Sequence, residues 1–118
     1  MVRSEYTLKT LHMWQVKTNP ETVLFLDNLE IPSRNKIRYA VSLLKEYGHL
    51  IRAPHSKKIS VHPSLFELRS SGNSPVRVFY SFHNGVFYLL HGYIKKSNKT
   101  PKKEISIAIN RHKVLTFE

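Results

Sequence analysis

Three groups of side chains in the second half of the chain could bind and act on an anion. Arg77 stands between two valines in an apolar run, where a charge is costly unless a partner meets it. His91 titrates near neutral pH and could move a proton. It precedes a cluster of five lysines: Lys95, Lys96, Lys99, Lys102 and Lys103. These residue types predict a site that binds the phosphate groups of a substrate and transfers protons during its reaction.

Each group also has a purely structural interpretation. The planar guanidinium of Arg77 fits phosphate oxygens, but it could equally form an ion pair with Glu67, the acid in the neighbouring predicted strand. Arg69, close to the following turn, is expected to reach the same groove. The lysines could form a solvated loop, and His91 could be a packing residue. The sequence leaves these alternatives open.

The net charge of +11 is unevenly distributed. Residues 1–51 carry 7 Lys or Arg against 5 acids, whereas residues 52–118 carry 12 against 3. A surface of one sign repels itself and usually persists because it meets a polyanion, most often nucleic acid. The alternative is a basic face that is only solvated.

Several other kinds of chemistry fit the composition poorly. The chain has no cysteine, its seven histidines lack metal-ligand spacing, and Asp27 is its single aspartate, so we expect no metal and no cofactor. Its four glycines form no phosphate-binding loop or dinucleotide motif, and no serine lies in a nucleophile elbow. No apolar run approaches the roughly 18 residues of a membrane span. We therefore expect a cytoplasmic protein with metal-independent chemistry.

The length favours a single domain over residues 1–118, with a small α+β fold. Residues 6–16 are expected to form a strand. Asn19-Pro20 predicts the start of a helix that ends near Leu29, and a second helix is expected from Pro32-Ser33 to Gly48. The cations on the second helix, Arg34, Lys36, Arg38 and Lys45, are interpreted as a solvated face.

The rest of the chain predicts the sheet and a last helix. Residues 52–63 are expected to be a loop with at most a short extended piece, and residues 65–69 a strand whose Glu67 and Arg69 share one face. Asn84-Gly85 is typical of a two-residue turn between strands over 76–82 and 86–94. A regular register then pairs Arg77 with Gly92, Val78 with His91, and Tyr80 with Leu89.

Thr100-Pro101 predicts the start of the last helix, with Thr100 as cap and Pro101 at its first position. Its apolar stripe is Ile105, Ala108, Ile109 and His112. The expected order is strand, two helices, three strands and helix, around a small antiparallel sheet.

Three runs of this sequence, LFELR, VRVFYSF and YLLHGYIKKSNKTPKKEISIAINR, resemble the phage-derived RelE/HigB toxins of type II toxin-antitoxin systems. The resemblance covers roughly residues 19–113. It is most specific in LLHGYIKKSNKTPKKEI, where glycine, paired lysines and Thr-Pro follow a spacing similar to that of the family. The resemblance supports the α+β fold named above.

The resemblance implies an endoribonuclease, or messenger-RNA interferase, that acts on the ribosome or on free RNA and inhibits translation. A small helix-turn-helix antitoxin of the HigA kind would neutralise it in a hetero-oligomer. In such enzymes the ribose 2′-hydroxyl attacks the adjacent phosphate. By the matched motifs, Arg77 would stabilise the phosphorane, Lys95 and Lys96 would grip the scissile region, and His91 would act as base or acid. Contacts to the rest of the RNA would fall to Arg69, Tyr93, Lys99, Lys102 and Lys103.

Two departures from the family pattern concern this site. Some relatives carry a tyrosine in or near the final helix, which is absent here, so Tyr93 or Tyr80 is the substitute. Glu67 stands where some relatives carry a basic residue. Two other functions stay open: a non-catalytic nucleic-acid module, and an interaction module whose basic groove receives an acidic helix.

Overall fold

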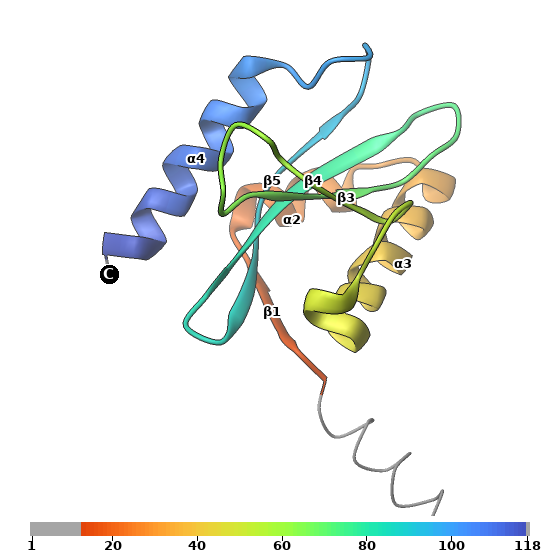
Figure 1. The fold of residues 1–118 in the computed structure, drawn as a ribbon. Coiled ribbons are helices and arrows are strands. Elements are labelled where there is room, and N and C mark those ends of the chain that lie inside the picture. Colours follow the sequence, from red (N-terminus) through yellow and green to blue (C-terminus); the bar gives the residue numbers. More distant parts are fainter. Residues whose placement is uncertain (1–12, 118) are drawn as a thin grey trace, which may run out of the picture.

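The computed structural model describes residues 13–117 and shows an α+β architecture (Figure 1). Most of the strand expected over 6–16 lies outside the described residues. The order of elements otherwise confirms the expected fold. The elements are β1 (Gln15–Thr18), α2 (Pro20–Asp27), α3 (Ile31–Tyr47), a 3-10 turn (Gly48–Leu50), β2 (Ser56–Lys58), β3 (Phe66–Arg69), β4 (Val76–His83), β5 (Val86–Ile94) and α4 (Lys102–Phe117).

The five strands form one sheet in the order β1-β5-β4-β3-β2. Strands β2 to β5 are antiparallel neighbours, but β1 pairs with β5 in parallel. The expectation of a wholly antiparallel sheet is therefore wrong at this edge. The reason is that β1 and β5 are far apart in sequence, so no short turn dictates their relative direction. β2 is the short extended piece within the segment expected to be a loop.

The helix boundaries follow local signals. The side chain of Asn19 accepts a hydrogen bond of 2.8 Å from the backbone N–H of Thr22, which caps α2 as predicted. Gly48 ends α3 with a φ of 55°, and a Cβ at this position would collide with the indole of Trp14. Both the left-handed backbone and the close ring therefore require glycine.

The start of α4 differs from the expectation by one residue. The carbonyl of Pro101 accepts hydrogen bonds from the N–H groups of Glu104 (3.1 Å) and Ile105 (3.2 Å), so Pro101 precedes the first helical residue, Lys102. The predicted cap at Thr100 is wrong, because Pro101 already supplies the first acceptor.

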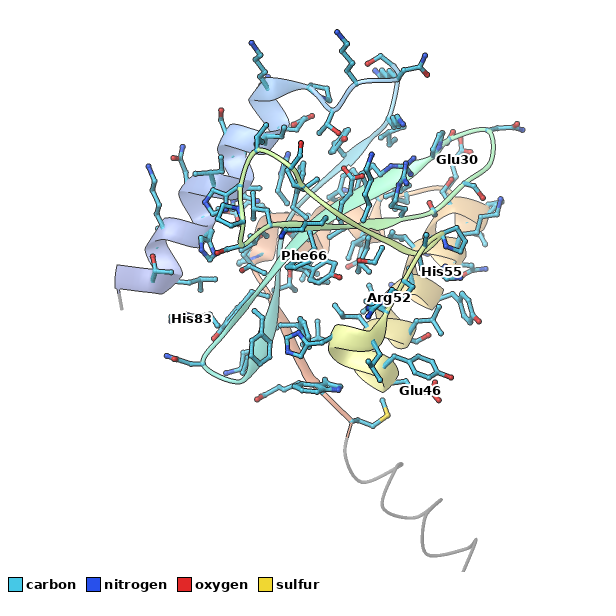
Figure 2. The ribbon with its side chains drawn as sticks, in the orientation of Figure 1. Glu30, Glu46, Arg52, His55, Phe66 and His83 are labelled. Carbon is cyan, nitrogen blue, oxygen red and sulfur yellow. The ribbon has the colours of Figure 1, made fainter. Side chains whose placement is uncertain are left out.

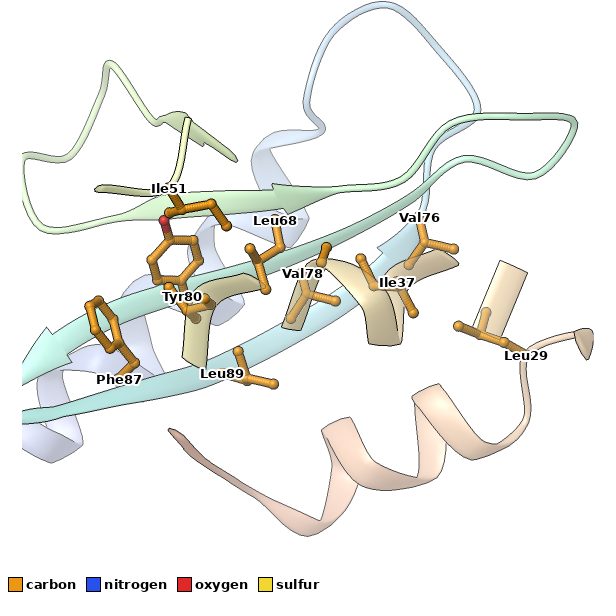
Figure 3. Packing of buried hydrophobic residues seen from close by; sticks show 11 residues of the cluster. Leu29, Ile37, Ile51, Leu68, Val76, Val78, Tyr80, Phe87 and Leu89 are labelled. Carbon is orange, nitrogen blue, oxygen red and sulfur yellow. The ribbon is translucent and has the colours of Figure 1, made fainter. Parts of the chain in front are cut away.

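Helices cover both faces of the sheet (Figures 1 and 3). Leu68, Val78, Tyr80 and Phe87 pack toward α3 in the larger core cluster. Phe79, Leu90 and Tyr93 pack toward Ala108 of α4 in the smaller one. The apolar stripe predicted for α4 is confirmed, since Ala108 and His112 are buried and Ile105 and Ile109 pack against this cluster. Within the described residues, no helix combines the length and apolarity needed to cross a membrane.

An irregularity in the hairpin changes which residues face each other. Tyr80 lies opposite Leu89 as predicted, but the register shifts between Phe79 and Tyr80. Beyond this point Val78 pairs with Gly92 and Arg77 pairs with Tyr93. The predicted pairs of Val78 with His91 and Arg77 with Gly92 are therefore wrong. The physical reason is one extra residue in β5, Leu90, which a regular register cannot accommodate.

The carbonyl of Leu90 is satisfied by side chains. It accepts hydrogen bonds from Asn19 Nδ2 (2.9 Å), Thr22 Oγ1 (3.3 Å) and Arg111 Nη1 (2.7 Å). A buried carbonyl left without partners would be costly, so these donors stabilise the bulge. They also join the start of α2 and the middle of α4 to the same peptide group of β5.

Candidate functional site

A cavity of about 630 Å³ opens at the end of β3, between the sheet edge and α3. Three of its lining residues carry a positive charge: Lys36, Arg69 and Arg77. Among the residues that line it in the described chain, none is acidic. Its remaining lining residues are Asn35, Tyr39, Pro54, His55, Ser70 and Ser71. The composition of this wall suits an anionic ligand.

Arg77 is held firmly in one orientation. Its side chain is 8% exposed, and Nη1 donates to the backbone carbonyls of Ser70 (2.7 Å) and Val76 (3.0 Å). Its Nε lies 3.6 Å from Oε1 of Glu67, so the structural ion pair is present. Arg77 is also one of the residues that line the cavity.

Arg69 shares the same carboxylate oxygen. Its Nε also lies 3.6 Å from Oε1 of Glu67, and this nitrogen has no hydrogen-bond partner in the described structure. Its side chain is 28% exposed, while that of Glu67 is 4% exposed. Two guanidinium groups therefore depend on one buried carboxylate, and the site keeps an uncompensated positive charge.

The electrostatics of Arg77 reflect this imbalance. Burial lowers the pKa of Arg77, the nearby charge of Arg69 lowers it further, and Glu67 and Tyr93 raise it. A phosphate group in the cavity would supply negative charge that the protein lacks. Within this group of three side chains, the two arginines carry more positive charge than Glu67 balances.

Tyr93 stands beside these arginines, whereas Tyr80 does not. Tyr93 pairs with Arg77 across the strands, and its hydroxyl donates to Oε2 of Glu67 at 3.5 Å. Burial raises the pKa of Tyr93, partly opposed by a hydrogen bond with Thr100, so the phenol is protonated at neutral pH. Tyr80 packs on the opposite face and shares a hydrogen bond of 2.6 Å with Ser56. Of the two predicted substitutes, only Tyr93 lies near the arginines.

His91 lies within β5, three residues before its end. Its Nε2 lies 2.8 Å from Oε1 of Glu104 in the first turn of α4, and its ring stacks on Phe79. The structure places it under α4 and outside the set of residues that line the arginine cavity. These contacts join β5 to α4.

The lysine segment begins near the cavity and then leaves it. The N–H of Lys95 donates to the carbonyl of Pro75 at 2.8 Å, which joins this segment to the turn between β3 and β4 (Figure 1). Lys96 lines a second cavity of about 440 Å³ together with Phe25, Tyr93 and Glu104. Tyr93 therefore lies between a cavity with two arginines and a cavity with a lysine.

The remaining predicted RNA contacts lie at the surface. Lys99 is exposed in the loop, and Lys102 and Lys103 are exposed in the first turn of α4. The structure thus brings together Arg69, Arg77 and Tyr93. It places Lys96 in the adjoining cavity, and it leaves Lys99, Lys102 and Lys103 outside both.

Sequence reasoning missed the wall of the cavity that α3 supplies. Lys36, which the sequence places on a solvated face, lines the cavity, and its Nζ donates to the carbonyl of Ser71 at 3.2 Å. The ring of Tyr39, three residues later, contacts the ring of His55. His55 lies in the segment that follows α3 in the chain (Figure 2). An aromatic residue beside a cation on one helix face is the signal that could have indicated a binding wall. Residues 52–55 carry no comparable pattern that would have predicted the contribution of His55 to this wall.

Histidines and carboxylates do not gather into a metal site: within the described chain, no three of them come close enough to hold an ion.

The fold and this cavity define a small α+β domain with a cationic pocket at one end of its sheet. A model of the family "Phage derived protein Gp49-like" matches residues 24–113, and the chain belongs to this family. A mutant of the E. coli toxin RelE in the free state has the same fold, with a TM-score of 0.63 and 15% identity over 84% of this chain and 97% of that one. No curated protein matches. The expected likeness to RelE-type toxins is confirmed in family and fold.

Proposed function

We propose that this protein is a toxin that cleaves messenger RNA without a metal ion. The observation that carries the proposal is the sharing of one buried carboxylate, that of Glu67, by Arg69 and Arg77 at the wall of an open cavity. Phosphoryl transfer within RNA adds negative charge to the phosphate in the transition state, and preorganised cations are what such a step needs. Membership of the Gp49-like family and the RelE-like fold support this assignment.

In the proposed reaction the ribose 2′-hydroxyl gives up its proton to a water molecule as its oxygen attacks the adjacent phosphorus, and the bond from phosphorus to the 5′-oxygen of the next nucleotide breaks. The products are a 2′,3′-cyclic phosphate and a 5′-hydroxyl. Arg77 and Arg69 would stabilise the phosphorane oxygens. Tyr93 would protonate the departing oxygen, because its phenol is protonated and lies beside Arg77.

The lysines would hold the flanking RNA. Lys96 lines the second cavity and Lys95 directly precedes it, so these two would contact the RNA nearest to Tyr93. The exposed side chains of Lys99, Lys102 and Lys103 would contact phosphates further along the strand. His91 would keep its predicted part in proton transfer only if the first turn of α4 moved, since Glu104 now holds its Nε2. The full proposal includes a cytoplasmic location, action on ribosome-bound messenger RNA, and a helix-turn-helix antitoxin as the partner in a hetero-oligomer.

Induction of the protein in bacterial cells tests the proposal. Wild-type protein should arrest growth and create new RNA ends that carry a 5′-hydroxyl. Arg69→Gln should lower the cleavage rate about 100-fold, because it removes one phosphorane-stabilising cation that carries little structural load. Lys45→Gln, an exposed cation of α3 outside the cavity, is the matched control. Absence of new 5′-hydroxyl ends with the wild-type protein contradicts the proposal.

A non-catalytic RNA-binding module is the second candidate. It is favoured by the contacts of Arg77, whose Nη1 and Nε are already engaged by Ser70, Val76 and Glu67. This function predicts salt-dependent RNA binding with intact transcripts. The same induction experiment separates the two candidates.

A further inference from the structure

We infer that the arginine cavity holds one unstacked nucleotide, with its base against Tyr39 and His55 and its phosphate toward Arg69 and Arg77. This inference rests on the proposed RNA-cleaving function and names the form of RNA that the site takes: a single strand with an accessible base.

The first observation is an aromatic pair in the lining of the cavity, formed by exposed Tyr39 and half-buried His55. Tyr39 projects from α3 with 58% of its surface exposed, and its ring centre lies 5.7 Å from that of His55 at an angle of 76°. In this edge-to-face arrangement the two rings do not cover each other's faces fully. A nucleobase has a flat face that stacks on such a ring, whatever its sequence.

The second observation is the rigid link between this pair and the arginines. The backbone carbonyl of His55 accepts a hydrogen bond of 2.9 Å from the N–H of Arg69, and the N–H of His55 donates to the carbonyl of Arg52 at 3.0 Å. The backbone of His55, which carries this ring, is therefore hydrogen-bonded to the end of β3. The ring that would stack on the base and the guanidinium that would bind the phosphate therefore come from two segments joined by a backbone hydrogen bond. The base and the phosphate of one nucleotide are likewise close together.

The third observation is the size and chemistry of the space. A cavity of about 630 Å³ lies within the range that small-molecule ligands occupy, and a single nucleotide is a ligand of that class. A base-paired helix would present its grooves and backbone instead, with its base faces already stacked. The amide of Asn35 offers both a donor and an acceptor to a base edge, and Lys36 adds a third cation on the α3 side. An apolar protein segment would leave these polar groups unpaired.

The test uses a short single-stranded 2′-fluoro oligonucleotide, which lacks the attacking hydroxyl and so cannot be cleaved. Binding is measured by fluorescence anisotropy at low salt, with an abasic unit placed at each position in turn. We expect one position at which loss of the base weakens binding to the wild-type protein about 10-fold. Tyr39→Leu should weaken binding of the intact strand by a similar factor and abolish the abasic effect at that position. Tyr39→Phe, which keeps the ring, should behave like the wild type.

Tyr47→Leu is the matched control, because Tyr47 also lies on α3 but does not line this cavity. It should leave the abasic effect unchanged. The inference would be overturned if the losses of affinity caused by Tyr39→Leu and by the abasic unit multiplied at every position, because the ring and the base would then act independently. It would also be overturned if Tyr39→Leu bound RNA as tightly as the wild type. If the wild-type protein cleaves transcripts in cells but Tyr39→Leu keeps the wild-type affinity and abasic effect, the proposed function stands while the base site falls.

Discussion

The carboxylate of Glu67 lies 3.6 Å from the Nε of Arg77 and is shared with a second arginine, Arg69. A buried carboxylate that serves two cations fixes both of them in place while neutralising only one. The stability of the fold and the affinity of the cavity for anions therefore oppose each other at this residue.

Replacement of Glu67 by glutamine should separate stability from anion binding. Glu67→Gln leaves the buried guanidinium of Arg77 and the partly exposed one of Arg69 without their counter-charge and should lower the free energy of unfolding by about 3 kcal/mol. The same change should tighten binding of the 2′-fluoro oligonucleotide, since the cavity then carries more positive charge. Urea unfolding with and without the oligonucleotide measures both effects.

Glu46→Gln removes an exposed acid from α3 and is the control for Glu67→Gln (Figure 2). It should change stability by less than about 0.5 kcal/mol. Equal stability of the two variants would mean that Glu67 does not hold the arginines.

Gly92 is expected to tolerate no side chain. A Cβ at this position would collide with the ring of Phe25 from α2. Gly92→Ala should therefore destabilise the protein by about 1–3 kcal/mol through overpacking. In the background Phe25→Ala the same substitution should cost much less, and a double-mutant cycle with urea unfolding measures the difference.

Gly85→Asn gives a reference for backbone effects alone. Gly85 has a φ of 81°, a Cβ added to it would meet no atom within 4 Å, and asparagine tolerates the left-handed region. This variant should cost less than about 1 kcal/mol. If Gly92→Ala destabilised the Phe25→Ala background as much as the wild type, contact with the ring of Phe25 would not be the cause of the loss.

The stability of the protein should fall in mild acid because of His112. Burial lowers the pKa of His112 from its ordinary value of 6.5, and the nearby His62 and His83 lower it further. The folded state thus binds fewer protons at this site than the unfolded state, so the stability present above pH 6.5 is lost as pH drops below that value. His112→Leu should flatten the profile of urea midpoint against pH between 7.5 and about 5.

His62→Gln should flatten this profile only in part, since it removes one neighbouring charge and leaves His112 buried. If the urea midpoint of His112→Leu fell with pH as steeply as that of the wild type, groups other than His112 would cause the acid sensitivity.

Removal of the Arg111 side-chain donor should loosen α4. Arg111 Nη1 donates to the carbonyl of Leu90 at 2.7 Å, and Arg111→Met keeps most of the side-chain length without the charge. We expect a loss of about 1–2 kcal/mol in the free energy of unfolding. Amide hydrogen exchange in α4 should also become faster. Lys113→Met, an exposed change in the same helix, should leave both unchanged.

The sequence was sufficient for the helices and the hairpin turn because their signals are local. Asn19, Gly48 and the Asn84-Gly85 pair each act through the backbone within a few residues of themselves. The bulge at Leu90 has no such signal. It depends on donors from Asn19, Thr22 and Arg111, which only the folded chain brings to that carbonyl. The parallel direction of β1 likewise depends on contacts distant in sequence.

The candidate site divides in the same way. Arg77 and Arg69 are predictable as candidate site residues, since charged residues in short apolar strands are unusual, whereas Tyr93 is indicated by the family resemblance alone. The wall formed by Lys36, Tyr39 and His55 is harder to predict, because only the pairing of Tyr39 with a cation on one helix face hints at it, and the proline-containing loop of His55 looks ordinary until β3 ends beside it. Strand alternation predicts that Glu67 and Arg69 share a face, and the pairing of β3 with β4 puts Arg77 next to them.

The three side chains that donate to the carbonyl of Leu90 are synthesised at different times. Two of its donors, Asn19 and Thr22, are made before the hairpin, whereas Arg111 is made 21 positions after Leu90. A nascent chain that stops short of Arg111 can assemble β1, α2 and the hairpin but must leave one side of this peptide group open. The peptide group of Leu90 therefore gains its third donor only once α4 has been synthesised and has packed on the sheet.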